Sequence, residues 1–211
     1  MATKLEIYNL ALSKLSAKRV ADLSENTPSR IICDQHYDIA RRTTLEAQHS
    51  WTFATSAFEL TSITVPVAYE TLWAKAYSYL ESAIQLIRVF QTDNADVKYI
   101  VRVYEETPSV FKQCILADME GLYAEYILDI EEPSFFSPLF IDALTTNLAS
   151  RIAFPLTRSA SFEQLFIQKF NTLIASAQTR DASESHAYYG REDSFLAARE
   201  GWGRASYPPP E

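Results

Sequence analysis

Glycine is almost absent from most of this chain. Of 211 residues only four are glycine, and none occurs before Gly121. Phosphate-binding loops and the dinucleotide fingerprint need several glycines, because glycine lets backbone N–H groups approach a phosphate closely. We therefore expect neither a nucleotide nor any other cofactor. The other three glycines all lie after about residue 182, so a packed body and a C-terminal segment of different composition are predicted.

The charge and cysteine content narrow the class further. The formal net charge is −8, and no basic run is longer than Arg41-Arg42, so the sequence predicts no basic surface for nucleic acid or anionic membranes. Cys33 and Cys114 lie far apart, without a Cys-x-x-Cys motif, which favours two buried thiols. The N-terminus has no apolar signal core, and no stretch approaches the ~20 apolar residues of a membrane span. We expect a protein made and kept in the cytoplasm, without a membrane partner.

The first fifty residues predict two helices. Thr3 and Glu6 have the spacing of a capping box, and apolar residues recur at helical intervals from Leu5 to about Ala17. Thr27-Pro28 is typical of an N-cap followed by proline at the first helical position, so a second helix is predicted from there to about Gln48. Its inward face is expected to hold Cys33, Tyr37, Ala40, Thr44 and Ala47, widened by Ile32, Ile39 and Leu45.

The middle of the chain has the composition of β-structure. After Trp51, threonine, valine, tyrosine, phenylalanine and isoleucine dominate, and strands are predicted at residues 84–90, 97–105, 111–117 and 122–130. The last two strands flank residues 118–121, which predict a hairpin turn with Gly121 at a positive φ. Residues 67–81 fit a helix or a strand.

Two more helices are predicted after Pro133. Ser137-Pro138 repeats the cap-then-proline pattern, and an apolar stripe follows until Pro155, where the helix is expected to end. Ser161 and Gln164 begin the next helix. Its apolar face is expected to contain Phe162, Leu165, Phe166, Phe170, Leu173, Ile174 and Ala177.

These elements predict an α+β fold in three parts. A helical bundle is formed by both chain ends, from residues 1–50 and 134–181, and a small antiparallel β domain, residues 51–133, is inserted between them. Residues 182–211 form an extended C-terminal arm with a single branched aliphatic residue, Leu196. The arm carries five aromatic residues, which favours docking into the pockets of a partner. Packing of the arm on its own domain, or a frayed tail, remains the alternative.

Candidates for catalysis are few. Cys33 and His36 lie three residues apart on one helix face and form a possible thiolate pair, but a buried cysteine beside a half-exposed histidine is the commoner arrangement. His49 and His186 complete the histidines, and no metal-ligand spacing occurs. The adjacent acidic residues are Glu105-Glu106, Glu131-Glu132 and the nearby Asp118 and Glu120. Strand neighbours point to opposite faces and turn carboxylates are usually solvated. We expect no catalytic or metal site and no enzyme.

Several segments, in order and spacing, carry a resemblance to a known family. In the first half they are Ile7-Tyr8-Asn9-Leu10-Ala11-Leu12, then Cys33, Tyr37, Arg41 and Leu45, then His49-Ser50-Trp51-Thr52-Phe53-Ala54. In the second half they are Phe136-Ser137-Pro138-Leu139-Phe140-Ile141-Asp142-Ala143-Leu144, Leu148-Ala149-Ser150-Arg151-Ile152-Ala153 and Pro155-Leu156-Thr157. Together they resemble the tail tubular protein A family of short-tailed bacteriophages, the head-to-tail adaptor, over roughly residues 3–199. The chain departs from the family pattern at residues 79–86.

The resemblance implies an architectural function. Members of that family form a ring, dodecameric in those known, that binds the portal protein, presents a platform to the tail nozzle protein and leaves a channel for DNA. It implies a virion protein of the head-tail junction that is in the host cytoplasm during assembly. The net negative charge suits a channel through which DNA passes without sequence-specific binding. The resemblance also makes the arm the portal-binding element, with Tyr188, Tyr189, Phe195, Leu196, Arg199, Trp202 and Tyr207 as its site residues.

Two other classes of function stay open at this point. One is a virion-associated hydrolase of the cell wall or capsule, which would use carboxylates such as Glu105 or Glu131. The other is a non-viral protein-binding module of the same composition. A zymogram on peptidoglycan or capsule distinguishes the first from an adaptor, and co-purification with virus particles distinguishes the second.

Overall fold

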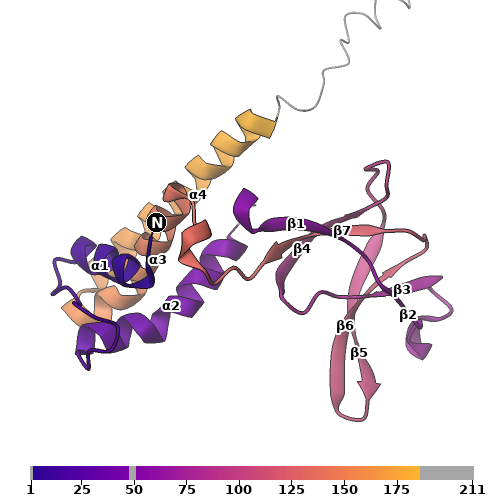
Figure 1. The fold of residues 1–211 in the computed structure, drawn as a ribbon, viewed down its shortest axis with the longest axis horizontal. Helices are drawn as coiled ribbons and strands as arrows, with labels where there is room; N and C mark the ends of the chain where they lie inside the picture. The colour runs from indigo at the N-terminus through magenta and orange to yellow at the C-terminus, as the bar shows by residue number, and fades with distance from the viewer. Residues whose placement is uncertain (1, 48–50, 186–211) are drawn as a thin grey trace, which may run out of the picture.

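The computed structural model describes residues 2–47 and 51–185 and has an α+β fold. Helices gather at one end of the molecule, near the N-terminus, and the strands form the other end (Figure 1). The helices are α1 (Lys4–Lys14), α2 (Pro28–Glu46), α3 (Pro138–Thr157) and α4 (Ala160–Ser185). Three short 3-10 helices connect the other elements: η1 (Thr52–Ala54), η2 (Val67–Tyr69) and η3 (Pro133–Phe135).

The helix starts follow the capping signals. Thr3 accepts a hydrogen bond from the backbone N–H of Glu6, and the Glu6 side chain accepts one from Thr3, so the predicted capping box is confirmed. Ser137 caps α3 through the N–H of Phe140, with proline next to it. Pro155, however, lies inside α3. The helix ends at Arg158, which adopts a left-handed conformation with φ of 55°, so the predicted end at Pro155 is wrong.

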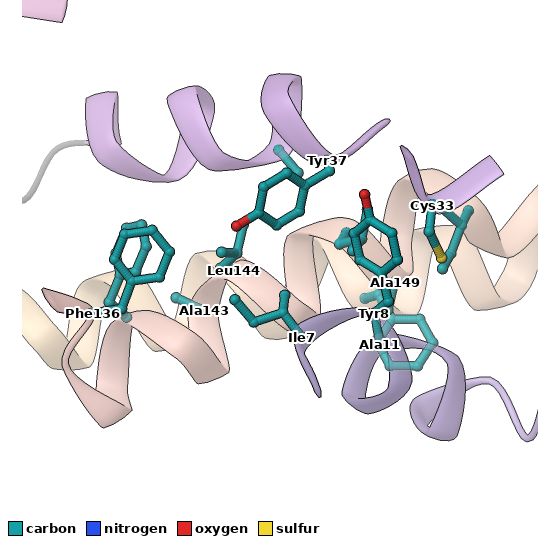
Figure 2. Packing of buried hydrophobic residues seen from close by; sticks show 14 of the residues in the cluster. Ile7, Tyr8, Ala11, Cys33, Tyr37, Phe136, Ala143, Leu144 and Ala149 are labelled. Atoms are coloured by element: carbon teal, nitrogen blue, oxygen red, sulfur yellow. The ribbon is translucent and has the colours of Figure 1, made fainter. Parts of the chain in front are cut away.

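One hydrophobic core joins the four helices. Side chains from α1, α2 and α3 interlock in it, among them Ile7, Tyr8, Cys33, Tyr37 and Leu144 (Figure 2). Aromatic rings close the end of the core that faces the sheets, with centroid distances of 4.7 to 6.4 Å. These rings belong to Trp51, Phe53, Phe136 and Phe140.

Strands form two antiparallel sheets. The three-stranded sheet has the order β1 (Thr55–Glu59), β7 (Tyr123–Leu128), β4 (Ala83–Phe90). The four-stranded sheet has the order β2 (Ser62–Ile63), β3 (Lys75–Ser78), β6 (Val110–Ala117), β5 (Tyr99–Thr107). The β5–β6 hairpin projects away from the rest of the molecule (Figure 1), with Ser109 at its turn in a left-handed conformation with φ of 69°.

The expected architecture, a helical bundle from both chain ends with one small inserted β domain and an extended C-terminal arm, is wrong. The middle of the chain contains two sheets and is dominated by strands. Two of these, β1 and β2, were not predicted, and β3 lies in residues 67–81, which fitted a helix or a strand. The helices do not make up both chain ends: α4 continues to Ser185, four residues beyond the predicted end of the bundle at residue 181, and the 26 residues after it lie outside the described part.

The predicted hairpin around residues 118–121 is also wrong. Gly121 does have a positive φ, 65°, as its turn requires. However, β6 pairs with β3 and β5, whereas β7 pairs with β1 and β4. The turn therefore carries the chain from one sheet to the other, because a turn signal sets the local bend and leaves the pairing partner to long-range packing.

Candidate functional site

A buried arginine joins the helical layer to the sheets. Arg41 lies on the inward side of α2, and its side chain is only 1% exposed. Its guanidinium forms an ion pair with Asp129 and donates a hydrogen bond of 2.8 Å to the carbonyl oxygen of Ile130. Both partners lie in the segment that leads from β7 back to α3. Because a buried charge is tolerated only when it is paired, this contact ties α2 to that segment.

The charges around Arg41 are unequal in burial. The Asp129 side chain is 19% exposed and forms a second ion pair with Arg42, whose Nε lies 3.0 Å from the other carboxylate oxygen. Glu131 and Asp38 approach the Arg41 guanidinium at 3.6 and 3.9 Å, but their side chains are mostly exposed. Asp129 is therefore the principal counter-ion, and Glu131 and Asp38 contribute weakly through solvent.

A second polar cluster fixes α1 on α2. The Tyr8 hydroxyl donates a 2.8 Å hydrogen bond to Asp34, and Lys4 lies 3.1 Å from the same oxygen. The hydrogen bonds from Tyr8 and Lys4 lower the pKa of the Asp34 carboxyl. Burial, together with the Asp34 carboxylate, raises the pKa of Tyr8. The cluster is a contact between helices, because each charged group already has its partner within the fold.

The thiol considered for nucleophilic chemistry lies in the hydrophobic core. Cys33 is fully buried, and burial raises the pKa of its thiol to about 12. The thiol is therefore protonated at neutral pH, and a nucleophilic pair with His36 would lack its thiolate. His49 and His186 lie outside the described residues. Within residues 2–47 and 51–185, no three histidine, cysteine or acidic side chains gather as metal ligands.

The adjacent carboxylates have structural partners. Glu105 accepts the backbone N–H of Ser109, and Glu106 pairs with Lys112 at 2.8 Å across the hairpin. Asp118 accepts the N–H of Ala74, and Glu120 pairs with Lys75. Glu131 approaches Arg41, as described above, and Glu132 is exposed. The partners assigned to Glu105, Glu106, Asp118 and Glu120 stabilise turns and the hairpin, and none holds two carboxylates together.

Apolar side chains are exposed along α4. The buried side of this helix packs against α3 through Phe166, Ile174 and Ala177. Phe162 and Leu165 were expected on that buried face, but these residues are 43% and 41% exposed. Ile167 is 44% exposed. Residues 160–177 contain only two charged side chains, so this helix surface is unusually apolar for one that faces solvent.

Other exposed apolar side chains lie on the β5–β6 hairpin, in and after η2, and on α2. Val103, Val110 and Phe111 are exposed on the projecting β5–β6 hairpin, and Val67 and Leu72 are exposed in and after η2. In α2, Ile39 was expected to widen the inward face, but it is 53% exposed. Exposed apolar side chains are thus distributed over several parts of the molecule.

The site residues predicted for the C-terminal arm lie outside the described residues. They are Tyr188, Tyr189, Phe195, Leu196, Arg199, Trp202 and Tyr207. Arg41, by contrast, lies at the contact between α2 and the segment after β7, and the sequence motifs did not predict this buried position. A signal was present, because position 41 falls one helical turn after Tyr37 and beside Ala40 on the inward face.

Comparison with known proteins gives no assignment. No protein-family model matches the chain, and no curated protein matches its sequence. Among the described helices, none combines the length and the apolar composition needed to cross a membrane. The function is therefore argued from the residues and their geometry.

Proposed function

We propose that this protein is a structural virion protein, a ring-forming head-to-tail adaptor that joins the portal to the tail nozzle and leaves a channel for DNA. The observation that carries the proposal is the apolar surface spread over α4, the β5–β6 hairpin and η2. A ring subunit meets a neighbour on each of two sides and other proteins above and below. Apolar side chains on several separate surfaces suit such a subunit better than an isolated monomer.

The resemblance to tail tubular protein A supports the proposal through the core. The residues on which the resemblance rests lie around one core, among them Tyr8, Tyr37, Arg41 and Leu144. Leu144 follows the other three by more than a hundred residues in the sequence. Residues that match a family in their order and also pack together in the fold support membership of that family more strongly than the order alone. Packing requires that the spacing of the residues also be compatible in three dimensions.

The residues after Ser185, which include the seven predicted site residues and are called the arm below, belong to the proposal as its portal-binding element. A chain that ends after Ser185 keeps every core residue that the structure describes, of which the last in α4 is Ala177. We expect this shortened chain to melt cooperatively with the helical circular dichroism of the full chain, and to lose binding to portal particles. Portal binding retained by the shortened chain would remove the arm from the proposal.

Electron microscopy of the purified protein bound to portal particles tests the ring. A ring of copies beneath the portal, twelve-fold by the resemblance, is the expected result. The matched variants are Leu165→Asp with Ile167→Asp, which charge the exposed apolar surface of α4, and Gln168→Asp, which adds a charge to the same helix at a polar position. The first pair is expected to reduce ring formation at unchanged helicity, and the control is expected to assemble. Single copies on the portal, with no ring in the wild type, would overturn the proposal.

A further inference from the structure

A groove runs between the two edges of the four-stranded sheet. Its lining consists of residues 62–70, which contain β2 and η2, and residues 103–106 of β5. In the strand order β2-β3-β6-β5 these are the two outermost strands, so the groove of about 1160 Å³ lies where the sheet has no further strand among the described residues.

The β5 side of the groove is an unpaired strand edge. β5 is nine residues long and, within the described part of the chain, pairs only with β6. The carbonyl oxygen of Val101 accepts a hydrogen bond from the side chain of Arg102, so it points away from β6. Because backbone groups alternate along a strand, the N–H and carbonyl of Val103, a residue that lines the groove, also point away from β6. A long strand edge of this kind can accept another extended chain.

The groove combines an apolar lining with negative charge. Its lining residues include Ile63, Val65, Val67 and Val103, and three carboxylates, with no lysine or arginine. Of the carboxylates, Glu106 is neutralised by Lys112. Glu70 and Glu105 have no cationic partner among the described residues. Val103 and Glu105 lie two residues apart on one face of β5, so a segment that fits the groove carries apolar side chains and lysine or arginine at positions two residues apart.

We propose that this groove binds an extended basic segment of a partner protein, which adds to the edge of β5 as a further strand. Backbone hydrogen bonds to β5 hold the segment, its apolar side chains cover Val103 and the residues around η2, and its cations face Glu70 and Glu105. The inference is independent of the adaptor function, since it rests on the strand edge, the apolar lining and the charge.

Fluorescence anisotropy with the full-length chain tests the proposal. The probe is a labelled eight-residue peptide with the repeat valine-valine-lysine-lysine, which places a valine and a lysine two residues apart on the same face, as Val103 and Glu105 lie on β5. Two control peptides differ from the probe by one property each. One replaces lysine with glutamate, and the other carries N-methyl groups on every second residue, which remove the N–H donors along one edge. Each control is expected to bind at least about tenfold more weakly than the probe. Equal binding by the three peptides, or no binding by the probe, would overturn the proposal.

Variants of the protein locate the binding. Glu70→Gln with Glu105→Gln removes both unpaired charges and is expected to weaken the probe about three- to tenfold, with a loss of salt dependence. Glu25→Gln with Glu46→Gln, which removes two charges far from the groove, is expected to leave the affinity unchanged. Equal effects of the two double variants would mean a general attraction to an acidic protein, and the assignment to the groove would fail.

Two other occupants of the groove give distinct results. If the chain's own C-terminus fills the groove, an unlabelled synthetic peptide of residues 201–210 displaces the probe at a lower concentration than the unlabelled lysine-valine peptide does. A fall in the sedimentation coefficient of the Glu70→Gln and Glu105→Gln variant would identify the groove as a contact between copies. Either result would overturn the assignment to a separate partner.

Discussion

The pair formed by Arg41 and Asp129 leads to an asymmetric prediction. Replacement of Asp129 by alanine leaves a guanidinium that is 1% exposed with one carbonyl partner and two exposed carboxylates at 3.6 and 3.9 Å. Removing one partner of a buried ion pair costs about 3–5 kcal/mol, because the remaining charge stays buried without compensation. We expect the free energy of unfolding of Asp129→Ala to fall by that amount.

Replacement of Arg41 by methionine has a smaller expected effect. Methionine keeps much of the packing of the arginine stem, and Asp129 keeps Arg42 at 3.0 Å. The losses are the hydrogen bond to the carbonyl of Ile130 and the contact with Asp129, about 1–2 kcal/mol together. In the double variant Arg41→Met with Asp129→Ala, no charge is left buried, so this chain is expected to be more stable than Asp129→Ala alone.

Thermal and urea unfolding followed by circular dichroism measures these differences. For a chain of this size, 1 kcal/mol shifts the melting temperature by roughly 2–4 °C, so Asp129→Ala is expected to melt roughly 6–20 °C below the wild type. Arg42→Ala is the matched control: its side chain is 60% exposed, so the change is expected to cost less than about 1 kcal/mol. The reasoning is wrong if Arg41→Met is the more damaging single variant, or if the two effects simply add.

Three further predictions concern a buried side chain of the helical core, the two cysteine thiols and the carboxyl of Asp34. Leu144→Asp places a charge in the fully buried core and is expected to abolish the cooperative melt, whereas Phe154→Asp, at an exposed position of the same helix, is expected to stay folded. Burial raises the pKa of both Cys33, to about 12, and Cys114, so a disulfide-exchange reagent at pH 8 is expected to modify neither thiol until urea is added; rapid reaction without urea would contradict their burial. The pKa of Asp34 is lowered in the folded state, so its contribution to stability is present above the usual pKa of a carboxyl and is lost as the pH falls below about 4. Asp34→Asn is expected to flatten that part of the curve of melting temperature against pH, and an unchanged acid slope would show that Asp34 does not contribute.

Local signals in the sequence predict the helices better than the sheets. The starts of α1 and α3 depend on Thr3 and Ser137, whose side chains bond to backbone groups three residues away. Such contacts are readable from spacing alone. In contrast, β2 has two residues and β3 has four, too few for an alternating pattern to appear. β3 pairs with β6, more than thirty residues further along the chain, and β2 pairs with β3, so long-range packing decides whether these segments become strands.

The buried ion pair shows a similar limit. A basic residue at position 41, on the face of α2 that also carries Tyr37 and Thr44, indicates a cation that needs a buried partner. The partner, Asp129, lies 88 residues away, beyond a chain segment that forms both sheets. Helical periodicity can therefore identify the member of the pair that must be compensated, but the compensating residue follows only from the packing of the sheets on the helices.

The residues that the apolar pattern placed wrongly have a common property. Ile39, Phe162 and Leu165 continue the apolar stripes of their helices, yet in the folded chain they face solvent. If the apolar stripe of each helix served only to pack the core of a single chain, these exposed positions could carry charged side chains. The exposed surface of α4 would then have the usual alternation of lysine and glutamate. An apolar stripe wider than the core beneath it is instead what a helix needs when a second molecule completes its burial. On this argument, Leu165→Asp should leave the stability of the isolated chain nearly unchanged while it impairs assembly, whereas Leu144→Asp should destroy both. A large loss of stability in Leu165→Asp would show that this side chain already belongs to the core.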